Sequence, residues 1–208
     1  MPFSMSVCKA AFCFNEFLFS KTCGTWARPG KHLQADETVL RGVKTQDPRG
    51  RKRSRPQWLC GFCEVDTLSG KTLRVGPPSL LAQNEGRKKV LVVPGIVAAA
   101  CENSVVITDE LRSYMCLDEF IPGVLHGSVC HKREFVNALG QHTNNIERCW
   151  GAMKDIMEQL WPRNWSRGDD DELVSRAHLA TLLYNASLSG SDPFATLLSA
   201  IKLSVSDD

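Results

Sequence analysis

Short apolar runs separated by turn residues fill the first two thirds of the chain. They predict a strand in "HLQADETVL" (32–40), a β-hairpin in "QWLCGFCEVDTLSGKTLRV" with its turn at 66–70, and later strands in "SVVITDE" and "GVLHGSVC". A basic loop is predicted over 44–56, between the first strand and the hairpin. The stretch "VLVVPGIVAAAC" is apolar, but its Pro-Gly pair is expected to break any regular element there.

Helical periodicity takes over in the last third of the chain. After Asn144, apolar residues recur at 146, 150, 153, 157 and 160, which is typical of an amphipathic helix, and Pro162 is expected to end it. A second helix is predicted to begin near the acidic run 169–171, and a third to begin at Asp192-Pro193. Strands followed by helices predict a mixed α/β domain with a central sheet flanked by helices.

Charge is concentrated in one segment rather than spread over the chain. The 208 residues have a net charge of only +2, yet 49–55 holds five basic residues: Arg49, Arg51, Lys52, Arg53 and Arg55. This run could contact DNA phosphates, act as a nuclear localisation signal, or form a solvated loop. No run approaches the roughly 20 apolar residues of a membrane span. The protein is expected to be intracellular, nuclear in a eukaryote and cytoplasmic in a bacterium, so the sequons at Asn164 and Asn185 are not expected to be used.

The cysteines and histidines do not have the spacing of a zinc site. Of nine cysteines, only Cys60 and Cys63 form a close pair, without a second pair to complete a site. They lie in a predicted strand, where residues three apart point to opposite faces. Reduced thiols, as in a cytoplasmic or nuclear protein, are expected instead of a zinc site. A second group matches no standard finger spacing: His126, Cys130, His131 and His142.

Three acids stand where separate elements would display them. Asp36 lies in the first strand, Asp109 ends an apolar strand, and Glu147 opens the long helix. Converging carboxylates are what Mg²⁺ requires, and two such ions can promote phosphodiester chemistry. Lys154 returns to nearly the same helix face as Glu147, where it could meet a DNA phosphate. The alternative is that these acids only cap helices and favour helix dipoles; Asp66 is interpreted as a turn residue.

Several motifs in order resemble one known family. The segments are "PGKHLQADETVLRG", "QWLCGFCEVDTLSGKTLRV", "SVVITDELRSY" and "HGSVCHKREFVNALGQHTNNIERCWGAMK", which together cover about 29–160. They resemble the catalytic domain of ISXO-two-like (Merlin-type) DDE transposases. The resemblance implies a ribonuclease-H-like fold and a site with two Mg²⁺ or Mn²⁺ ions held by Asp36, Asp109 and Glu147. It also implies that Lys154 supports DNA and that His142 and Asn144 shape the site, with Asn144 a lesser candidate for the third ligand.

The resemblance predicts DNA strand cleavage followed by strand transfer. The expected partners are transposon-end and target DNA, with a possible homo-oligomer and no membrane. The predicted organisation is a poorly interpretable segment (1–27), a ribonuclease-H-like core (28–161), and C-terminal helices packing on it (162–208). Because only 35 residues precede Asp36 and they match no DNA-recognition region, the alternative is a truncated or domesticated derivative that binds DNA or a partner without transposition. A plain metal-dependent nuclease is a third possibility.

Overall fold

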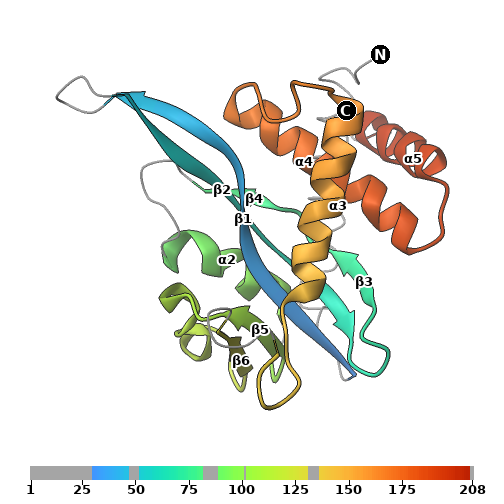
Figure 1. The fold of residues 1–208 in the computed structure, drawn as a ribbon. Helices are drawn as coiled ribbons and strands as arrows, with labels where there is room; N and C mark the ends of the chain where they lie inside the picture. The colour runs from blue at the N-terminus through green and yellow to red at the C-terminus, as the bar shows by residue number, and fades with distance from the viewer. Residues whose placement is uncertain (1–29, 47–51, 82–88, 101, 131–135, 207–208) are drawn as a thin grey trace.

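A mixed, open β-sheet lies at the centre of the protein, with helices on both of its faces (Figure 1). The structure is a computed structural model that describes residues 30–46, 52–81, 89–100, 102–130 and 136–206, so the prediction for 1–27 lies outside it. The strands are β1 (Lys31–Gln46), β2 (Lys52–Asp66), β3 (Thr72–Val75), β4 (Ser79–Leu80), β5 (Val105–Asp109) and β6 (Leu125–Val129). The helices are α2 (Lys89–Ala99), α3 (Asn144–Leu160), α4 (Asp170–Leu188) and α5 (Pro193–Ser206), with short 3-10 helices η1 (Arg112–Tyr114) and η2 (Leu117–Glu119). The predicted mixed α/β class is confirmed.

Strand β1 lies at the centre of the sheet, where the two strand directions meet. The order is β3-β2-β1-β5-β6, with β4 also pairing with β2. β1 runs antiparallel to β2, and β2 is antiparallel to β3 and β4. β1 and β5 are parallel, as are β5 and β6. A side chain on β1 can therefore meet residues from both halves of the sheet.

The first two strands are much longer than the sequence pattern predicts. The expected loop over 44–56 is wrong in most of its length, because β1 continues to Gln46 and β2 begins at Lys52. Their register shifts between Val39 and Arg41, so Leu40 is the extra residue of a β-bulge. Beyond the bulge the residues are mostly polar and basic. The alternation of apolar and polar positions that reveals a strand is therefore missing there.

The predicted hairpin between β2 and β3 is confirmed, and a side chain covers its outer edge. Asp66 Oδ1 accepts hydrogen bonds from the Ser69 amide and hydroxyl, both at 2.8 Å, and Gly70 has a φ of +65° that suits the turn. On β3, the Asn185 side chain accepts from the Val75 amide at 2.8 Å and donates to the Val75 carbonyl at 2.9 Å. The side-chain amide of Asn185, a sequon residue, thus satisfies backbone groups of the edge strand β3.

Helix α2 contains the Pro-Gly pair that was expected to break it, and that expectation is wrong. Pro94 lies inside the helix and is exposed. A proline in a helix interior costs about 3 kcal/mol because it removes a hydrogen bond and crowds the preceding turn. Val92, Val93 and Ile96 are almost fully buried against the sheet, and their burial outweighs that cost. No helix in the described ranges is long and apolar enough to cross a membrane.

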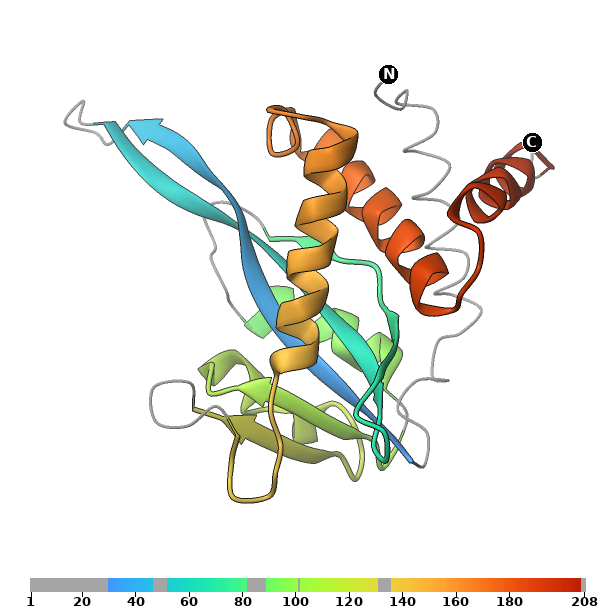
Figure 2. The ribbon, with the colours of Figure 1, turned by 45° about the vertical axis from the view of Figure 1, so that its right-hand side comes forward.

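Helices α3 and α4 cover the opposite face of the sheet and form the larger core with it. The predicted apolar stripe of α3 is confirmed: Ile146, Trp150, Met153 and Met157 are buried. Helix α4 begins where the acidic run predicts, with the Asp169 side chain accepting from the Glu172 amide at 2.8 Å. Its Leu173 joins the same core as α3. Figure 2 shows α3 lying across β1 and β2.

Candidate metal centre

One side of β1 carries a row of polar residues beneath α3. Leu33 and Ala35 point the other way, into the core formed with α2. Gln34 and Thr38, at alternate positions, hydrogen-bond to α3 instead. Because side chains alternate along a strand, Asp36 lies between these two on the α3 side.

Asp36 and Asp109 face each other on neighbouring parallel strands. The register pairs Leu33 with Val106 and Gln34 with Ile107, a constant offset of 73 residues, which continued along β1 places Asp36 opposite Asp109. The carboxylate oxygens of Asp36, Asp109 and Glu37 can all lie within 4.8 Å of one another. These are hard oxygen donors at a spacing that suits a divalent cation. The two aspartates predicted from the sequence are therefore brought together.

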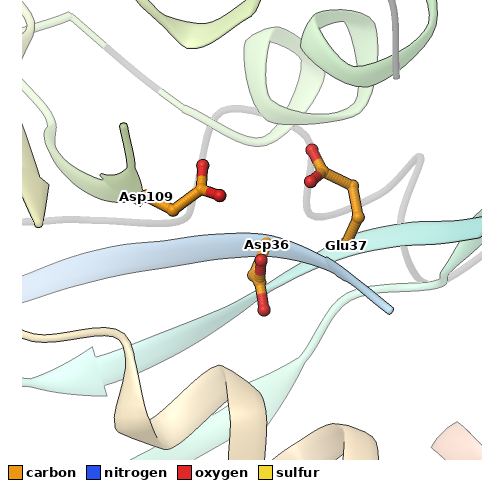
Figure 3. A group of neighbouring side chains, drawn as sticks. All are labelled: Asp36, Glu37 and Asp109. Carbon is orange, nitrogen blue, oxygen red and sulfur yellow. The ribbon is translucent and has the colours of Figure 1, made fainter. Parts of the chain in front are cut away.

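Glu37, which was not among the ligands predicted from the sequence, is the third member of this group. Figure 3 shows Asp36 and Glu37 leaving β1 on opposite sides, with Asp109 at the end of β5. Glu37 is buried, and its Oε1 accepts a hydrogen bond from the Tyr114 hydroxyl of η1. Burial, followed by the negative charge of Glu37, raises the pKa of Tyr114 well above its ordinary value. The pair ties the segment after Asp109 to β1 and so helps to hold Asp109 in place.

Glu147 lies on α3, near Asp36 but outside the group of three. It is exposed in the first turn of the helix. Among the described residues it completes no set of three acids at the spacing given above. Its charge is nevertheless close enough to raise the pKa of Asp36. The structure brings the predicted third ligand near Asp36 without placing it in the cluster with both aspartates.

Lys154 occupies the same side of α3 and is anchored to β1. Its Nζ donates a hydrogen bond to Thr38 Oγ1 at 2.6 Å. Burial lowers the pKa of Lys154, and the charge of Asp36 opposes that shift. Thr38 thus holds the ammonium group beside Asp36, where it can meet an anionic ligand.

Asp36 is the acid most affected by its surroundings. Its pKa is raised to about 7, first by burial, and then by the charges of Glu37, Asp109 and Glu147, with a hydrogen bond from the Glu37 amide working in the opposite direction. Without a cation the carboxyl is therefore partly protonated at neutral pH. A bound divalent cation would favour the charged form, so metal binding is expected to release a proton.

This raised pKa predicts a pH dependence of stability. Between pH 4 and 7 the folded protein holds a proton that the unfolded chain releases, so the free energy of unfolding falls as pH rises through this window. From pH 5 to pH 8 the loss attributable to Asp36 is expected to be about 2–3 kcal/mol. Urea denaturation in EDTA of the wild type and Asp36→Asn at both pH values measures it. The variant should lack this part of the loss, and equal losses in the two proteins would contradict the assigned pKa.

The remaining predicted site residues lie around this centre. Asn144 is the first residue of α3 and is half-buried. His142 Nδ1 is buried without a hydrogen-bond partner in the described part of the chain, and burial followed by His142 lowers the pKa of His32. His142 is thus brought near His32, and its predicted role in shaping the acidic site stays a prediction.

The zinc alternatives find no support in the arrangement of their residues. Cys60 packs in the core on the α2 side and Cys63 in the core on the α3 side, which confirms that they point to opposite faces. His126 Nε2 lies 2.9 Å from Thr108 Oγ1. Among the described residues the three acids are the only cluster with metal-ligand spacing. His131 lies outside the described residues.

The predicted DNA-binding residues are described in part. Lys52, Arg53 and Arg55 lie in β2, whereas Arg49 and Arg51 lie outside the described residues.

Gln34 fixes the start of α3 and was also missed. Its Oε1 accepts hydrogen bonds from the backbone amides of Asn145 at 3.0 Å and Ile146 at 3.3 Å, and its Nε2 donates to His32 Nε2 at 3.3 Å. The residue before the helix, Thr143, makes no side-chain cap. Gln34 therefore takes over that function from a neighbouring strand, and sets the position from which Glu147 projects. A signal for it exists in the sequence: polar residues recur at 32, 34, 36 and 38.

Replacing Gln34 with leucine is expected to lower the free energy of unfolding by about 1–3 kcal/mol, because two buried helix amides lose their acceptor. It should also weaken Mn²⁺ binding, measured by calorimetry. Asn185→Leu is the matched control. It removes a side-chain amide that is hydrogen-bonded to Val75 of β3, so it should lower stability without changing metal affinity. Equal metal affinities in the Gln34 variant and the wild type would contradict a positioning role.

Comparison with known proteins adds no family. No protein-family model matches the chain, and no curated protein matches it.

Proposed function

We propose that this chain is the catalytic domain of a DDE transposase of the ISXO-two-like kind, which cleaves and joins DNA strands with two bound metal ions. The observation that carries the proposal is the pairing of Asp36 with Asp109 on adjacent parallel strands, within metal-ligand spacing. The mixed open sheet, with the acid-bearing strand at its centre, is compatible with the ribonuclease-H-like fold that the sequence resemblance implies.

Each residue of the centre has a role in this proposal. Asp36 and Asp109 would hold the metal ions, and Glu147 would approach from α3 to complete the ligand set when the ions bind. Bound Mg²⁺ or Mn²⁺ would activate a nucleophilic oxygen and stabilise the leaving oxygen of a phosphodiester. Lys154, held by Thr38, neutralises a neighbouring phosphate. Glu37 remains bonded to Tyr114 and keeps the strand end that carries Asp109 in position.

The reaction has two steps. In the first, water attacks a phosphodiester at the transposon end, the bond to the 3′ oxygen breaks, and a 3′-hydroxyl is released. In the second, that hydroxyl attacks a phosphodiester of target DNA, whose own 3′ oxygen leaves. Neither step needs a covalent protein intermediate.

The test is nicking and strand transfer on a generic DNA duplex with Mn²⁺ or Mg²⁺. Products are expected with metal and absent after EDTA treatment, and joined products should appear when a pre-cleaved 3′-hydroxyl end is supplied. Nicking without joined products would favour a metal-dependent nuclease. No product from folded protein that binds metal would overturn the catalytic proposal.

A domesticated derivative that binds DNA without transposition is the second candidate. The position of Glu147, exposed and outside the group of three acids, is the observation that favours it. Retained DNA binding together with absent nicking would distinguish this function from the first.

A further inference from the structure

The start of helix α3 depends on a side chain from another element. The first amides of a helix have no partner inside it, and a side chain just before the helix usually accepts from them. Thr143, which precedes α3, makes no such bond. Gln34 of β1 accepts instead from the amides of Asn145 and Ile146, at 3.0 and 3.3 Å. These are the second and third residues of the helix, the two positions that a capping side chain serves.

These two bonds fix the orientation of the Gln34 side-chain amide. A backbone amide only donates, so the atom that faces Asn145 and Ile146 is the carbonyl oxygen Oε1. The other end of the group, Nε2, therefore faces His32, whose Nε2 lies 3.3 Å away. Because the side-chain nitrogen of glutamine also only donates, His32 Nε2 is the acceptor in this contact. The capped helix thus requires a ring nitrogen with a free lone pair at this position.

His32 is consequently neutral, with its proton on Nδ1. An imidazole that accepts at Nε2 carries its single proton on the other nitrogen, whereas the charged ring has a proton on both. Nδ1 lies 3.4 Å from Thr67 Oγ1, which accepts from it. The titratable groups that face the ring are His142, from the segment before α3, and Asp66, at the end of β2. Burial, followed by the charge of His142, lowers the pKa of His32, and the charge of Asp66 opposes that shift.

Protonation of His32 conflicts with the bonds that Gln34 makes. A proton on Nε2 would point at the Gln34 nitrogen, so two donors would meet without an acceptor between them. If the side-chain amide turns over, its nitrogen faces the helix amides and the cap is lost. If the ring moves away, the Gln34 nitrogen loses its partner in a site that is only 1% exposed, where water does not replace it. Either change removes part of what holds the start of α3.

We propose that His32 is a positioning residue: as the neutral tautomer it orients Gln34, which holds the start of α3, and uptake of a proton by the ring releases this hold. Glu147 lies in the same first turn of the helix, so its approach to Asp36 responds to the same proton. Only this consequence for metal binding rests on the proposed function. The link between His32 and the helix depends on the hydrogen bonds alone.

The experiment follows the protein by NMR in EDTA between pH 8 and pH 4.5. The His32 ring signals report its protonation and tautomer. Hydrogen exchange of the Asn145 and Ile146 amides, corrected for the intrinsic pH dependence of exchange, reports the cap. His32→Gln supplies an acceptor that does not titrate. His126→Gln is the matched control, because His126 is another half-buried histidine whose pKa is lowered by burial.

The wild-type ring should carry its proton on Nδ1 at pH 8 and should titrate with a pKa below the ordinary 6.5. Protection of the Asn145 and Ile146 amides should fall roughly tenfold along the same curve, the size expected for losing about one hydrogen bond. His32→Gln should lack this step, and His126→Gln should keep it. Asp36 titrates nearby in all three proteins, so only the part of the response that His32→Gln removes is assigned to His32.

Gln34→Glu is an independent variant, because it replaces the donor that faces His32 with an acceptor. Its carboxylate still accepts from the two helix amides, and it also accepts from a protonated ring. The pKa of His32 should therefore rise above 6.5, and the cap should persist when the ring is charged. A pKa that stays below 6.5 in this folded variant would contradict the contact between the two side chains.

The outcomes separate this inference from the proposed function. Constant amide protection while His32 titrates overturns the inference, as does an equal step in His32→Gln, even if the protein cleaves DNA. Mn²⁺ affinity, measured by calorimetry, should fall further between pH 8 and pH 5.5 in the wild type than in His32→Gln. Equal falls in a protein that shows the amide step support the inference about the helix and count against Glu147 as a metal ligand.

Discussion

Asp109→Asn is expected to abolish metal-dependent DNA cleavage, with a loss of roughly a thousandfold or more. The carboxylate is one of two paired across β1 and β5, and an amide is a weaker ligand without charge. Metal ions supply several kcal/mol of charge stabilisation in such reactions, and each 1.36 kcal/mol corresponds to a factor of ten in rate. Nicking of a labelled duplex with Mn²⁺, together with calorimetric titration of the metal, measures both effects.

The matched control is Asp155→Asn, an exposed acid on α3 outside the centre, which should cleave like the wild type. Glu147→Gln and Glu37→Gln then identify the third acid. If Glu147 completes the site, its variant loses cleavage but stays as stable as the wild type. Glu37→Gln should mainly lower stability, because a buried carboxylate bonded to Tyr114 is altered. Full activity in Asp109→Asn would remove the basis of the catalytic proposal.

Trp150→Ala is expected to lower the free energy of unfolding by about 3–5 kcal/mol, the range for removing a buried large aromatic side chain. Trp150 is 4% exposed and packs in the core that joins α3 to β2 and α4. It lies directly over Gly61, the residue paired with Asp36: a Cβ on Gly61 would come within 2.8 Å of the Trp150 ring. Urea denaturation of the metal-free protein measures the loss.

Trp150→Phe is the control, with an expected loss of less than about 1.5 kcal/mol, since the ring volume is largely kept and the indole nitrogen has no hydrogen-bond partner in the described structure. Because this contact sets how α3 lies on the sheet, Trp150→Ala should also weaken metal binding through Glu147. A loss below 1 kcal/mol in Trp150→Ala would show that the helix is held elsewhere.

Local patterns explain which elements the sequence predicts well. The strand around Asp36, the hairpin turn at 66–70, the strand ending at Asp109 and the amphipathic α3 all have the expected form. Each has a periodicity of apolar positions or a turn residue that acts over a few neighbours. The predictions fail where no such pattern exists. The part of β1 past Leu40 has a mostly polar sequence without alternating apolar positions, and the sequence of α2 is apolar on both sides of its proline.

By itself the sequence determined the mixed α/β class, the helix that carries Glu147 and Lys154, and two acids, Asp36 and Asp109, at positions suited to a metal. Only the tertiary structure decided that β1 and β5 lie side by side, which pairs two acids that are 73 residues apart in the sequence. It also decided that Gln34, a residue of β1, caps the start of α3. It also decided that Glu37 is bound to Tyr114. These contacts join residues distant along the chain, so they depend on the packing of whole elements, which local periodicity does not specify.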